Sequence, residues 1–228
     1  MSSAVVILSG GLDSSVNLAM ALETMTVKLA LTFDYGQRAA KKEISASSQL
    51  CEYYKVKHQV IEIPWVGAFG RSALTDSAIT IPTGDVSIDD FKISTRTAAK
   101  VWVPNRNGIF LNLAAGFAEA LDCKFVIPGF NLEEAATFPD NSEAFIGALK
   151  NSFSFSTANH VEVRCFTIQM IKTEILKIAV KKCLPLKMIW PCYFDGDKWC
   201  GECESCQRSK RAFKANGVDT VAYFKKFN

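Results

Sequence analysis

The hexapeptide Ser9-Gly10-Gly11-Leu12-Asp13-Ser14 lies between a predicted strand and a predicted helix near the start of the chain. Residues 4–8 (AVVIL) form an apolar run that is typical of a buried strand, and residues 16–25 have the apolar spacing of a helix. Together they predict a phosphate-binding loop, because glycines let the backbone approach an anion and the N–H groups of the helix start point at it. The alternative is an ordinary helix N-cap, since serine and aspartate are also favoured there.

The composition indicates one globular core. The chain has 228 residues, of which 49% are hydrophobic, enough for one full core with a small appendage. It has 26 basic and 23 acidic residues, a balance that does not predict a nucleic-acid-binding surface. No apolar run is long enough to span a membrane, and the first residues lack the pattern of a secretory signal. We therefore expect a cytoplasmic protein with no membrane partner and no direct nucleic-acid partner.

Further strand patterns alternate with helical patterns along the chain. This alternation predicts a Rossmann-like α/β fold, in which right-handed crossovers build a parallel sheet with helices on both faces. In such sheets, ligands bind at the carboxyl ends of the strands, near the switch in strand order. The further predicted strands are residues 27–33, 57–63, 124–128 and 161–165, and the clearest further helices are residues 41–54, 109–121, 143–153 and 172–182. Residues 65–100 hold no period for long and predict either an active-site loop or a mobile insertion.

Two polar segments precede or follow these elements in positions that suit a ligand site. Residues 34–38 (DYGQR) end the second strand and are either a polar turn or part of the site. Arg106 comes just before a helix for which Asn107 or Gly108 is the expected cap. An arginine at that point is well placed to meet a phosphate group, and a solvated loop arginine is the alternative.

A third polar segment, which contains Asn131, Phe138 and Asp140, follows the strand at residues 124–128. A carboxylate such as that of Asp140 can accept the N–H donors of a guanine-like edge in a bidentate pair, and Phe138 can stack on the ring. The alternative is a helix start, with Asp140 or Ser142 as the N-cap and Phe138 as a hydrophobic staple.

Four cysteines, Cys192, Cys200, Cys203 and Cys206, are close enough in sequence to surround one tetrahedral ion. The spacing and the polar loop favour zinc, while an iron–sulfur cluster and disulfides are the alternatives. Four protein ligands leave no open position, so we expect a structural ion. We accordingly predict a nucleotide-binding α/β domain over residues 1–186 and a zinc-binding segment over residues 187–228 that packs on it.

The motifs together resemble a known family. SGGLDSS at residues 9–15 resembles the signature of the PP-loop ATP pyrophosphatases, which have an adenine nucleotide alpha hydrolase-like fold. With FDYGQR, VPNRN, GFNLEEAATFPDNS, KTEI and the cysteine motif, it occurs in the order found in the 7-cyano-7-deazaguanine synthases of queuosine biosynthesis. The sequence departs from that family at Asn105, where many relatives have glycine, and at residues 137–142 (TFPDNS), where many have GYPDCR. Asp140 is the aspartate that both versions of this segment contain.

The resemblance implies a ligase that forms C–N bonds and converts 7-carboxy-7-deazaguanine, ammonia and ATP to 7-cyano-7-deazaguanine, AMP and pyrophosphate. It implies that Asp13 fixes the loop or helps to place Mg²⁺, and that Arg38 and Arg106 stabilise charge on the α-phosphate. Asn131, Phe138 and Asp140 would contact the deazaguanine. The residues implied to hold ATP are Leu8, Ser9, Gly10, Gly11, Leu12, Asp13, Ser14, Ser15, Val16 and Asn17.

Two alternative functions stay open at this point. One is another PP-loop ATP pyrophosphatase, such as a tRNA-modifying or amide-forming ligase. The other is a zinc-bearing, nucleotide-sensing module without turnover. The oligomeric state is also open, with a homodimer among the states considered.

Overall fold

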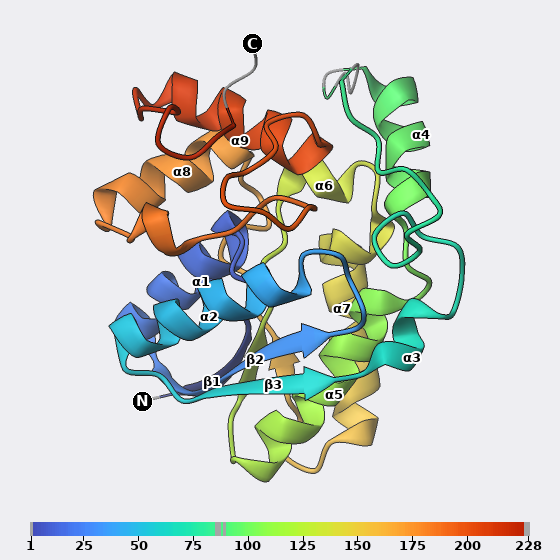
Figure 1. The fold of residues 1–228 in the computed structure, drawn as a ribbon. Helices are drawn as coiled ribbons and strands as arrows, with labels where there is room; N and C mark the ends of the chain where they lie inside the picture. The colour runs from blue at the N-terminus through green and yellow to red at the C-terminus, as the bar shows by residue number, and fades with distance from the viewer. Residues whose placement is uncertain (1, 85–87, 89, 226–228) are drawn as a thin grey trace.

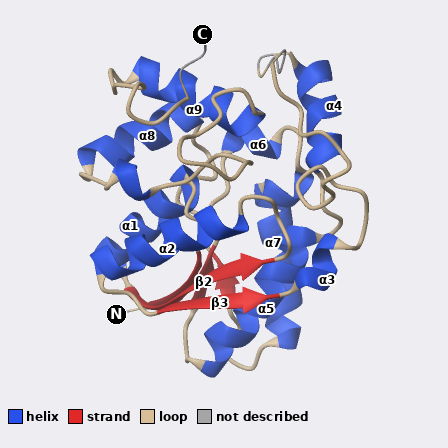
Figure 2. Ribbon diagram, viewed as in Figure 1, coloured by secondary structure: helices blue, strands red, loops and turns tan. Residues whose placement is uncertain are grey.

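A five-stranded parallel sheet forms the centre of the molecule (Figures 1 and 2). The computed structural model describes residues 2–84, 88 and 90–225. The strands lie in the order β3-β2-β1-β4-β5, so that β1 is central and the strand order switches beside it. This confirms the predicted α/β fold class. The strands are β1 (Ser3–Ile7), β2 (Thr26–Asp34), β3 (His58–Glu62), β4 (Phe125–Ile127) and β5 (Glu162–Val163).

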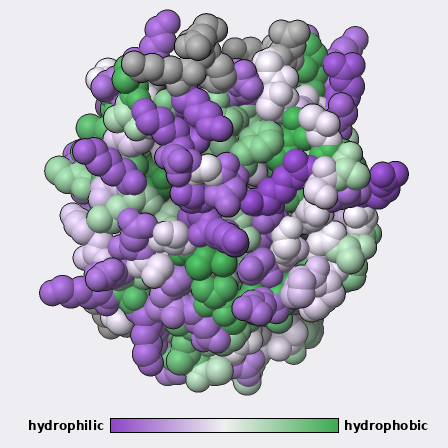
Figure 3. Space-filling model, in the orientation of Figure 1, coloured by the Kyte–Doolittle hydropathy of each residue, from purple (hydrophilic) through white to green (hydrophobic). Residues whose placement is uncertain are grey.

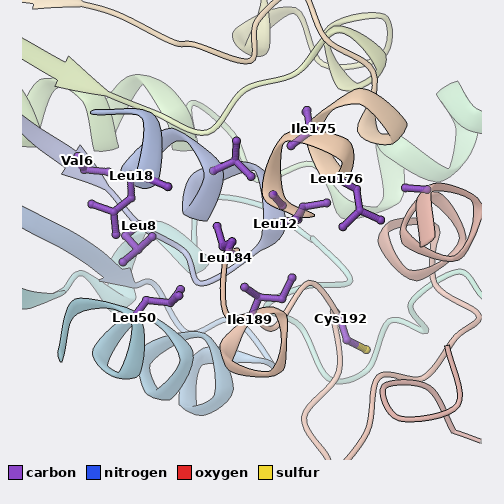
Figure 4. Close-up of a cluster of buried hydrophobic side chains, with 14 of the residues drawn as sticks. Val6, Leu8, Leu12, Leu18, Leu50, Ile175, Leu176, Leu184, Ile189 and Cys192 are labelled. Carbon is purple, nitrogen blue, oxygen red and sulfur yellow. The ribbon is translucent and has the colours of Figure 1, made fainter. Parts of the chain in front are cut away.

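Helices cover both faces of the sheet because side chains alternate along each strand. Val6 of β1 belongs to a buried cluster with α1, α2 and α8, whereas its neighbour Val5 belongs to a cluster with α5 and α7. Figure 4 shows the first cluster, in which Leu12, Leu50 and Ile175 come from three different helices. The helices are α1 (Leu12–Thr24), α2 (Ala40–Tyr54), α5 (Arg106–Ala120), α7 (Glu143–Ser156) and α8 (Lys172–Lys181).

The C-terminal segment continues the first cluster. It contains the short 3-10 helix η2 (Leu186–Met188) and α9 (Glu204–Ala215), which lies beside α8 (Figure 1). Trp199 and Phe213 are buried in the same cluster as the residues of α1. The backbone N–H of Trp190 also donates a hydrogen bond to the carbonyl oxygen of Gly10 at 2.7 Å. The segment therefore packs directly on the sheet domain, and the boundary at residues 186 and 187 stays a prediction.

The segment between β3 and α5 has more regular structure than the sequence pattern indicated. It contains α3 (Pro64–Gly67) and α4 (Phe91–Val101), and Asp90 caps α4 by accepting hydrogen bonds from the backbone N–H groups of Lys92 and Ile93. Residues 85–87 and 89 of this segment lie outside the described residues. Its role as an active-site loop or a mobile insertion stays a prediction, and Leu74 of this segment lines the cavity described below.

Two predicted helix starts can be compared with the structure. Helix α5 begins at Arg106 with Asn105 as its N-cap, so the prediction of Asn107 or Gly108 as the cap is wrong. Asn105 has a φ of +52°, a left-handed conformation that asparagine tolerates better than most residues. Before α7, the Oγ of Ser142 accepts a hydrogen bond from the N–H of Phe145, which makes Ser142 the cap. Two short elements, α6 (Leu132–Ala135) and η1 (Pro139–Asn141), lie between β4 and α7.

Polar side chains predominate on the face shown in Figure 3, and apolar ones form separate small patches there. This is ordinary for a globular protein, whose surface always includes some apolar atoms. No helix among the described residues is long and apolar enough to cross a membrane.

Candidate active site

The loop between β1 and α1 borders a cavity at the carboxyl edge of the sheet. Its hydroxyl groups are held in place: the Oγ atoms of Ser9 and Ser14 are 3.1 Å apart, and Ser15 Oγ donates to the carbonyl oxygen of Gly11 at 2.6 Å. This edge lies beside the switch in strand order, where nucleotides bind in related sheets. The predicted loop residues that line the cavity are Leu8, Ser9, Gly11, Leu12, Asp13 and Ser14.

Glycines allow the close approaches around this loop. Gly10 has a φ of +73°, and a Cβ there would lie 2.7 Å from the Cβ of Ala46 in α2. Gly129, just after β4, is more confined, since a Cβ there would lie 2.5 Å from the backbone nitrogen of Ser14. Gly11 differs, because its nearest neighbour would be Ser9 Oγ at 3.4 Å, an ordinary contact. Gly11 thus presents open backbone to the cavity, while Gly10 and Gly129 are needed for packing.

Four predicted ATP-binding residues, Gly10, Ser15, Val16 and Asn17, do not line the cavity. Asn17 is fully buried and donates from Nδ2 to the carbonyl oxygen of Asp13 and to Thr167 Oγ1. Its Oδ1 accepts from the N–H of Phe166. Asn17 therefore ties the loop to the segment after β5, and a direct contact with ATP stays a prediction for these four residues.

A buried lysine forms ion pairs with two carboxylates of the cavity. Lys172, the first residue of α8, places Nζ 2.6 Å from Asp13 Oδ2 and 3.1 Å from Glu134 Oε1. Burial disfavours the charge of Lys172, but the two carboxylates outweigh this and raise its pKa above the usual value. The other oxygen of the aspartate, Asp13 Oδ1, is buried and has no hydrogen-bond partner among the described residues. A buried, unpartnered carboxylate oxygen beside a phosphate loop suits a divalent cation.

Arg106 lies in the same cavity at the start of α5. Its Nη1 is 3.3 Å from the hydroxyl group of Tyr35, and its guanidinium carbon is 5.8 Å from the centre of the Tyr35 ring. Burial raises the pKa of Asp140, and the nearby Arg106 acts in the opposite direction. The predicted arginine is thus positioned in the cavity by an aromatic ring and a carboxyl group.

Arg38 has a different environment. Its Nη2 donates to the carbonyl oxygens of Asp76 and Ile79 at 2.8 and 2.5 Å. It does not line the cavity. In this structure Arg38 organises the segment that follows α3, and its predicted role at the α-phosphate is not supported by a position in the cavity.

The three residues predicted to bind deazaguanine differ in how close they lie to the cavity. Phe138 lines the cavity and stacks on Trp102, with ring centres 6.1 Å apart. Asp140 lies next to the cavity-lining Asn141 and accepts a hydrogen bond from its Nδ2 at 3.2 Å. Asn131 is fully buried, and its Oδ1 accepts from the N–H of Glu134 as the N-cap of α6. Only Phe138 of the three borders the cavity directly.

Glu43, which the sequence patterns did not identify, also lines the cavity, together with Gln37 of the polar segment at residues 34–38. Glu43 lies in the first turn of α2, and its Oε2 accepts from Gln37 Nε2 at 2.9 Å. Burial raises the pKa of Glu43 to about 7. A glutamate in the first turn of a helix gives no signal by itself, although Glu43 lies nine residues after the end of β2, at the edge of the sheet where ligands bind.

The four clustered cysteines come together as predicted. Their Sγ atoms all lie within 4.8 Å of one another, and those of Cys200 and Cys206 are 3.8 Å apart. Four thiolates around an ion at about 2.3 Å would be separated by about 3.8 Å, so the arrangement fits a tetrahedral metal site. Backbone N–H groups point at the sulfurs: those of Phe194 and Cys200 donate to Cys192 Sγ. All eight cysteines are free, which excludes the disulfide alternative.

The cysteine segment also reaches the cavity. Trp190, Pro191, Tyr193 and Ser205 line it from the C-terminal side. Behind them, Arg208 of α9 bridges Glu204 at 2.8 Å and Glu133 of the segment after β4 at 3.1 Å. The side chains of Arg208 and Glu204 are each 5% exposed. The segment that carries the four cysteines therefore forms one wall of the cavity.

A parallel sheet with a Gly-Gly loop after its central strand, beside a four-cysteine cluster, defines a nucleotide-binding α/β protein of the PP-loop class. The family model of Queuosine biosynthesis protein QueC matches residues 3–217, and the chain belongs to that family. The 7-cyano-7-deazaguanine synthase of Bdellovibrio bacteriovorus is 52% identical over 223 residues, which cover 97% of this chain and 96% of that protein. The 7-cyano-7-deazaguanine synthase of Desulforamulus reducens is 49% identical, and the match covers 96% of this chain and 97% of that protein. The resemblance found in the sequence is confirmed.

Among solved structures, NMN synthetase from Francisella tularensis is similar to this chain with a TM-score of 0.49 and 14% sequence identity. The match covers 96% of this chain and 79% of the other. Family membership rests on the sequence relatives and not on this distant likeness.

Proposed function

We propose that this chain converts 7-carboxy-7-deazaguanine, ammonia and ATP to 7-cyano-7-deazaguanine through an adenylated acid and an adenylated amide. The observation that carries this proposal is that one cavity is lined by the phosphate loop, by Arg106 and by the aromatic residue Phe138. This cavity can thus bind the phosphates of ATP, stabilise the charge that develops on the α-phosphate and hold a planar ring at the same time. The names of the sequence relatives supply the substrate class.

The chemistry requires ATP because a carboxylate is a poor electrophile until one of its oxygens becomes a leaving group. Attack of the carboxylate on the α-phosphate gives an acyl-adenylate and releases pyrophosphate. The N–H groups from Gly11 to Ser14, at the start of α1, bind the phosphates, and Arg106 stabilises the charge that develops on the α-phosphate. Asp13 Oδ1 is available to hold Mg²⁺, which would neutralise phosphate charge when bound.

Ammonia then displaces AMP and forms the amide. The amide oxygen must be activated in turn before a nitrile can form, so the same loop binds a second ATP. A single nucleotide loop in a chain with one sheet favours two successive reactions at one site.

For the deazaguanine, Phe138 provides a stacking surface and Asp140 a carboxyl group beside it. Asn131 does not reach the cavity and contributes indirectly, because its side chain caps the start of α6. Zinc is the ion that we propose for the four cysteines, since four thiolates in a closed tetrahedral set are typical of structural zinc. The cytoplasmic location and the independence from nucleic acid remain expectations, and the oligomeric state stays open with a homodimer among the states considered.

The test measures pyrophosphate release and nitrile formation by the purified protein with ATP, ammonium chloride and a panel of carboxylated purine analogues. We expect pyrophosphate release that requires the 7-carboxy-7-deazaguanine and a nitrile product that requires ammonium as well. Release with a different acid would favour another PP-loop ligase. Nucleotide binding without any release would favour the non-catalytic module.

A further inference from the structure

Ammonia poses a problem that the residues discussed so far do not solve. Near neutral pH it is present mostly as ammonium, which has no free electron pair and cannot attack an acyl-adenylate. An enzyme that uses it therefore needs a group that binds the cation and removes one proton. A carboxylate inside the cavity has the right charge and the right chemistry.

The cavity-lining carboxyl groups differ in their partners. Asp13 and Glu134 share the single positive charge of Lys172, and Asp13 Oδ1 is the oxygen proposed to hold Mg²⁺. Glu43 forms no salt bridge with the residues that the structure describes. Glu43 is therefore the one of these three carboxylates that is neither paired with Lys172 nor proposed to hold Mg²⁺.

The position of Glu43 is fixed by a glutamine that has no freedom to turn. Gln37 is 5% exposed, and its Oε1 accepts from the N–H of Tyr35 at 2.9 Å. Its Nε2 donates to the carbonyl oxygen of Phe33 at 3.1 Å and to Glu43 Oε2 at 2.9 Å. Both amide protons and the amide oxygen are therefore used, which holds Oε2 in place and leaves Oε1 for a ligand.

The surroundings suit the conversion of a cation to a neutral molecule. The rings of Phe33, Tyr35 and Phe110 line the same cavity, and those of Phe33 and Phe110 stack with centres 4.3 Å apart. Aromatic faces attract an entering cation and exclude water. The charged and titratable groups that face Glu43 are Asp34 at the end of β2, Tyr35 directly after it, and Arg106 from α5. Arg106 opposes a second positive charge and so favours ammonia after proton transfer.

Glu43 also lies close to the point where the acyl-adenylate must form. A Cβ on Gly10 would lie 2.9 Å from the carbonyl oxygen of Glu43, so the first turn of α2 touches the phosphate loop. We propose that Glu43 binds ammonium and accepts its proton, which delivers ammonia to the acyl-adenylate. This inference rests on the proposed function.

The step balances without another reactant. One N–H bond of ammonium breaks, its electron pair stays on nitrogen, and the proton moves to Glu43. The nitrogen pair forms the C–N bond, the C–O bond to AMP breaks with its electrons on AMP, and a second proton leaves the nitrogen for solvent. Glu43 then returns its proton to solvent. A burial-raised pKa of about 7 lets it do this near neutral pH.

The alternative is that Glu43 binds the N–H edge of the deazaguanine. A bidentate pair would have to share Oε2 with the Gln37 amide, which already donates to it, whereas an ammonium ion can bind at Oε1 alone. The structure therefore favours ammonium, and the experiment separates the two.

The test compares Glu43→Gln with wild type in three reactions: acid-dependent ATP–pyrophosphate exchange without ammonium, conversion of the acid with ammonium chloride, and conversion of 7-amido-7-deazaguanine. We expect kcat/KM for ammonium to fall about a hundredfold at neutral pH, with the other two reactions within about threefold of wild type. The loss should shrink toward about pH 9, where free ammonia increases. Glu43→Asp, which keeps a carboxylate, should retain more activity, and Glu52→Gln, on an exposed part of the same helix, is the matched control.

Equal losses in exchange and in amide conversion would show that Glu43 acts on the deazaguanine or on phosphate, and would overturn the inference. Unchanged ammonium kinetics in Glu43→Gln would overturn it too. Wild-type protein that forms neither amide nor nitrile from the acid would refute the proposed function itself, and the inference would fall with it.

Discussion

Lys172 Nζ lies 2.6 Å from Asp13 Oδ2, with the lysine side chain 3% and the aspartate side chain 12% exposed. This ion pair joins the phosphate loop to the first turn of a helix far along the chain. The charge of Lys172 is thus placed where a phosphate oxygen can share it, and the aspartate is held for a cation on its other oxygen.

Replacement of Lys172 by alanine should leave Asp13 and Glu134 as unpaired buried carboxylates. We expect the free energy of unfolding to fall by about 3 kcal/mol, as measured by urea unfolding, together with a loss of ATP binding. Lys177→Ala, at an exposed position of the same helix, is the control and should change neither quantity. Stability equal to wild type in Lys172→Ala would show that the pair is not formed.

The two glycines of the loop should respond differently to a methyl group. Gly10→Ala places a Cβ against Ala46 in a left-handed conformation, so we expect a loss of stability of about 2 kcal/mol or more. Gly11→Ala should leave stability and metal content close to wild type, because its Cβ has room, and should weaken ATP binding. Gly11→Val should abolish ATP turnover. Thermal unfolding, metal analysis and nucleotide titration measure these effects, and normal turnover in Gly11→Val would place the phosphates elsewhere.

Metal removal should destabilise the protein before it affects the phosphate loop. We expect about one zinc per chain and, in Cys203→Ser, a lower metal content with a melting temperature lower by about 10 °C. Cys183→Ser, which removes an exposed cysteine outside the cluster, should melt like wild type. Full metal loading and unchanged melting in Cys203→Ser would contradict the site.

Stability should depend on pH through Glu43. Its pKa rises from 4.5 to about 7 on folding, so between these values the folded protein holds a proton that the unfolded chain has released. Stability is therefore lost as pH rises through this window. Wild type should lose about 2–3 kcal/mol relative to Glu43→Gln between about pH 4.5 and about pH 7.5 in urea unfolding. Parallel pH profiles for the two proteins would contradict the burial of this carboxyl group.

Nitrile formation should consume two ATP. The acid must lose both oxygens, and each needs its own adenylation, so we expect two AMP and two pyrophosphate for each nitrile. The 7-amido-7-deazaguanine should need only one. Quantification of AMP against nitrile measures the ratio. A ratio near one from the acid, or ADP as the main product, would refute the double adenylation.

The parts of the protein with local signals were predicted well from the sequence. The strand, the Gly-Gly loop and the first helix follow one another directly, and their pattern predicts both the sheet and its functional edge. The four cysteines are likewise close in sequence, and their chemistry limits what they can bind. Each of these features depends on neighbours within a few residues.

Other features depend on contacts that no local pattern contains. Lys172 starts an amphipathic helix and would ordinarily be solvated there, yet packing of α8 on α1 buries it against Asp13. Asn105 caps α5 by adopting a left-handed conformation that its neighbours do not specify. Arg38 was expected beside the nucleotide, but the carbonyl oxygens of a distant segment hold it away. These positions are set by the tertiary fold.

The hydrogen bond from the Trp190 amide to the Gly10 carbonyl oxygen has a consequence for synthesis on the ribosome. The loop that holds Gly10 is made well before Trp190, because synthesis runs from the N-terminus. Chains fold as they emerge, so the sheet can assemble while the loop still lacks this bond. The hydrogen bond that holds the Gly10 carbonyl oxygen can therefore form only after the segment at Trp190 has been made, which makes it one of the late contacts of folding.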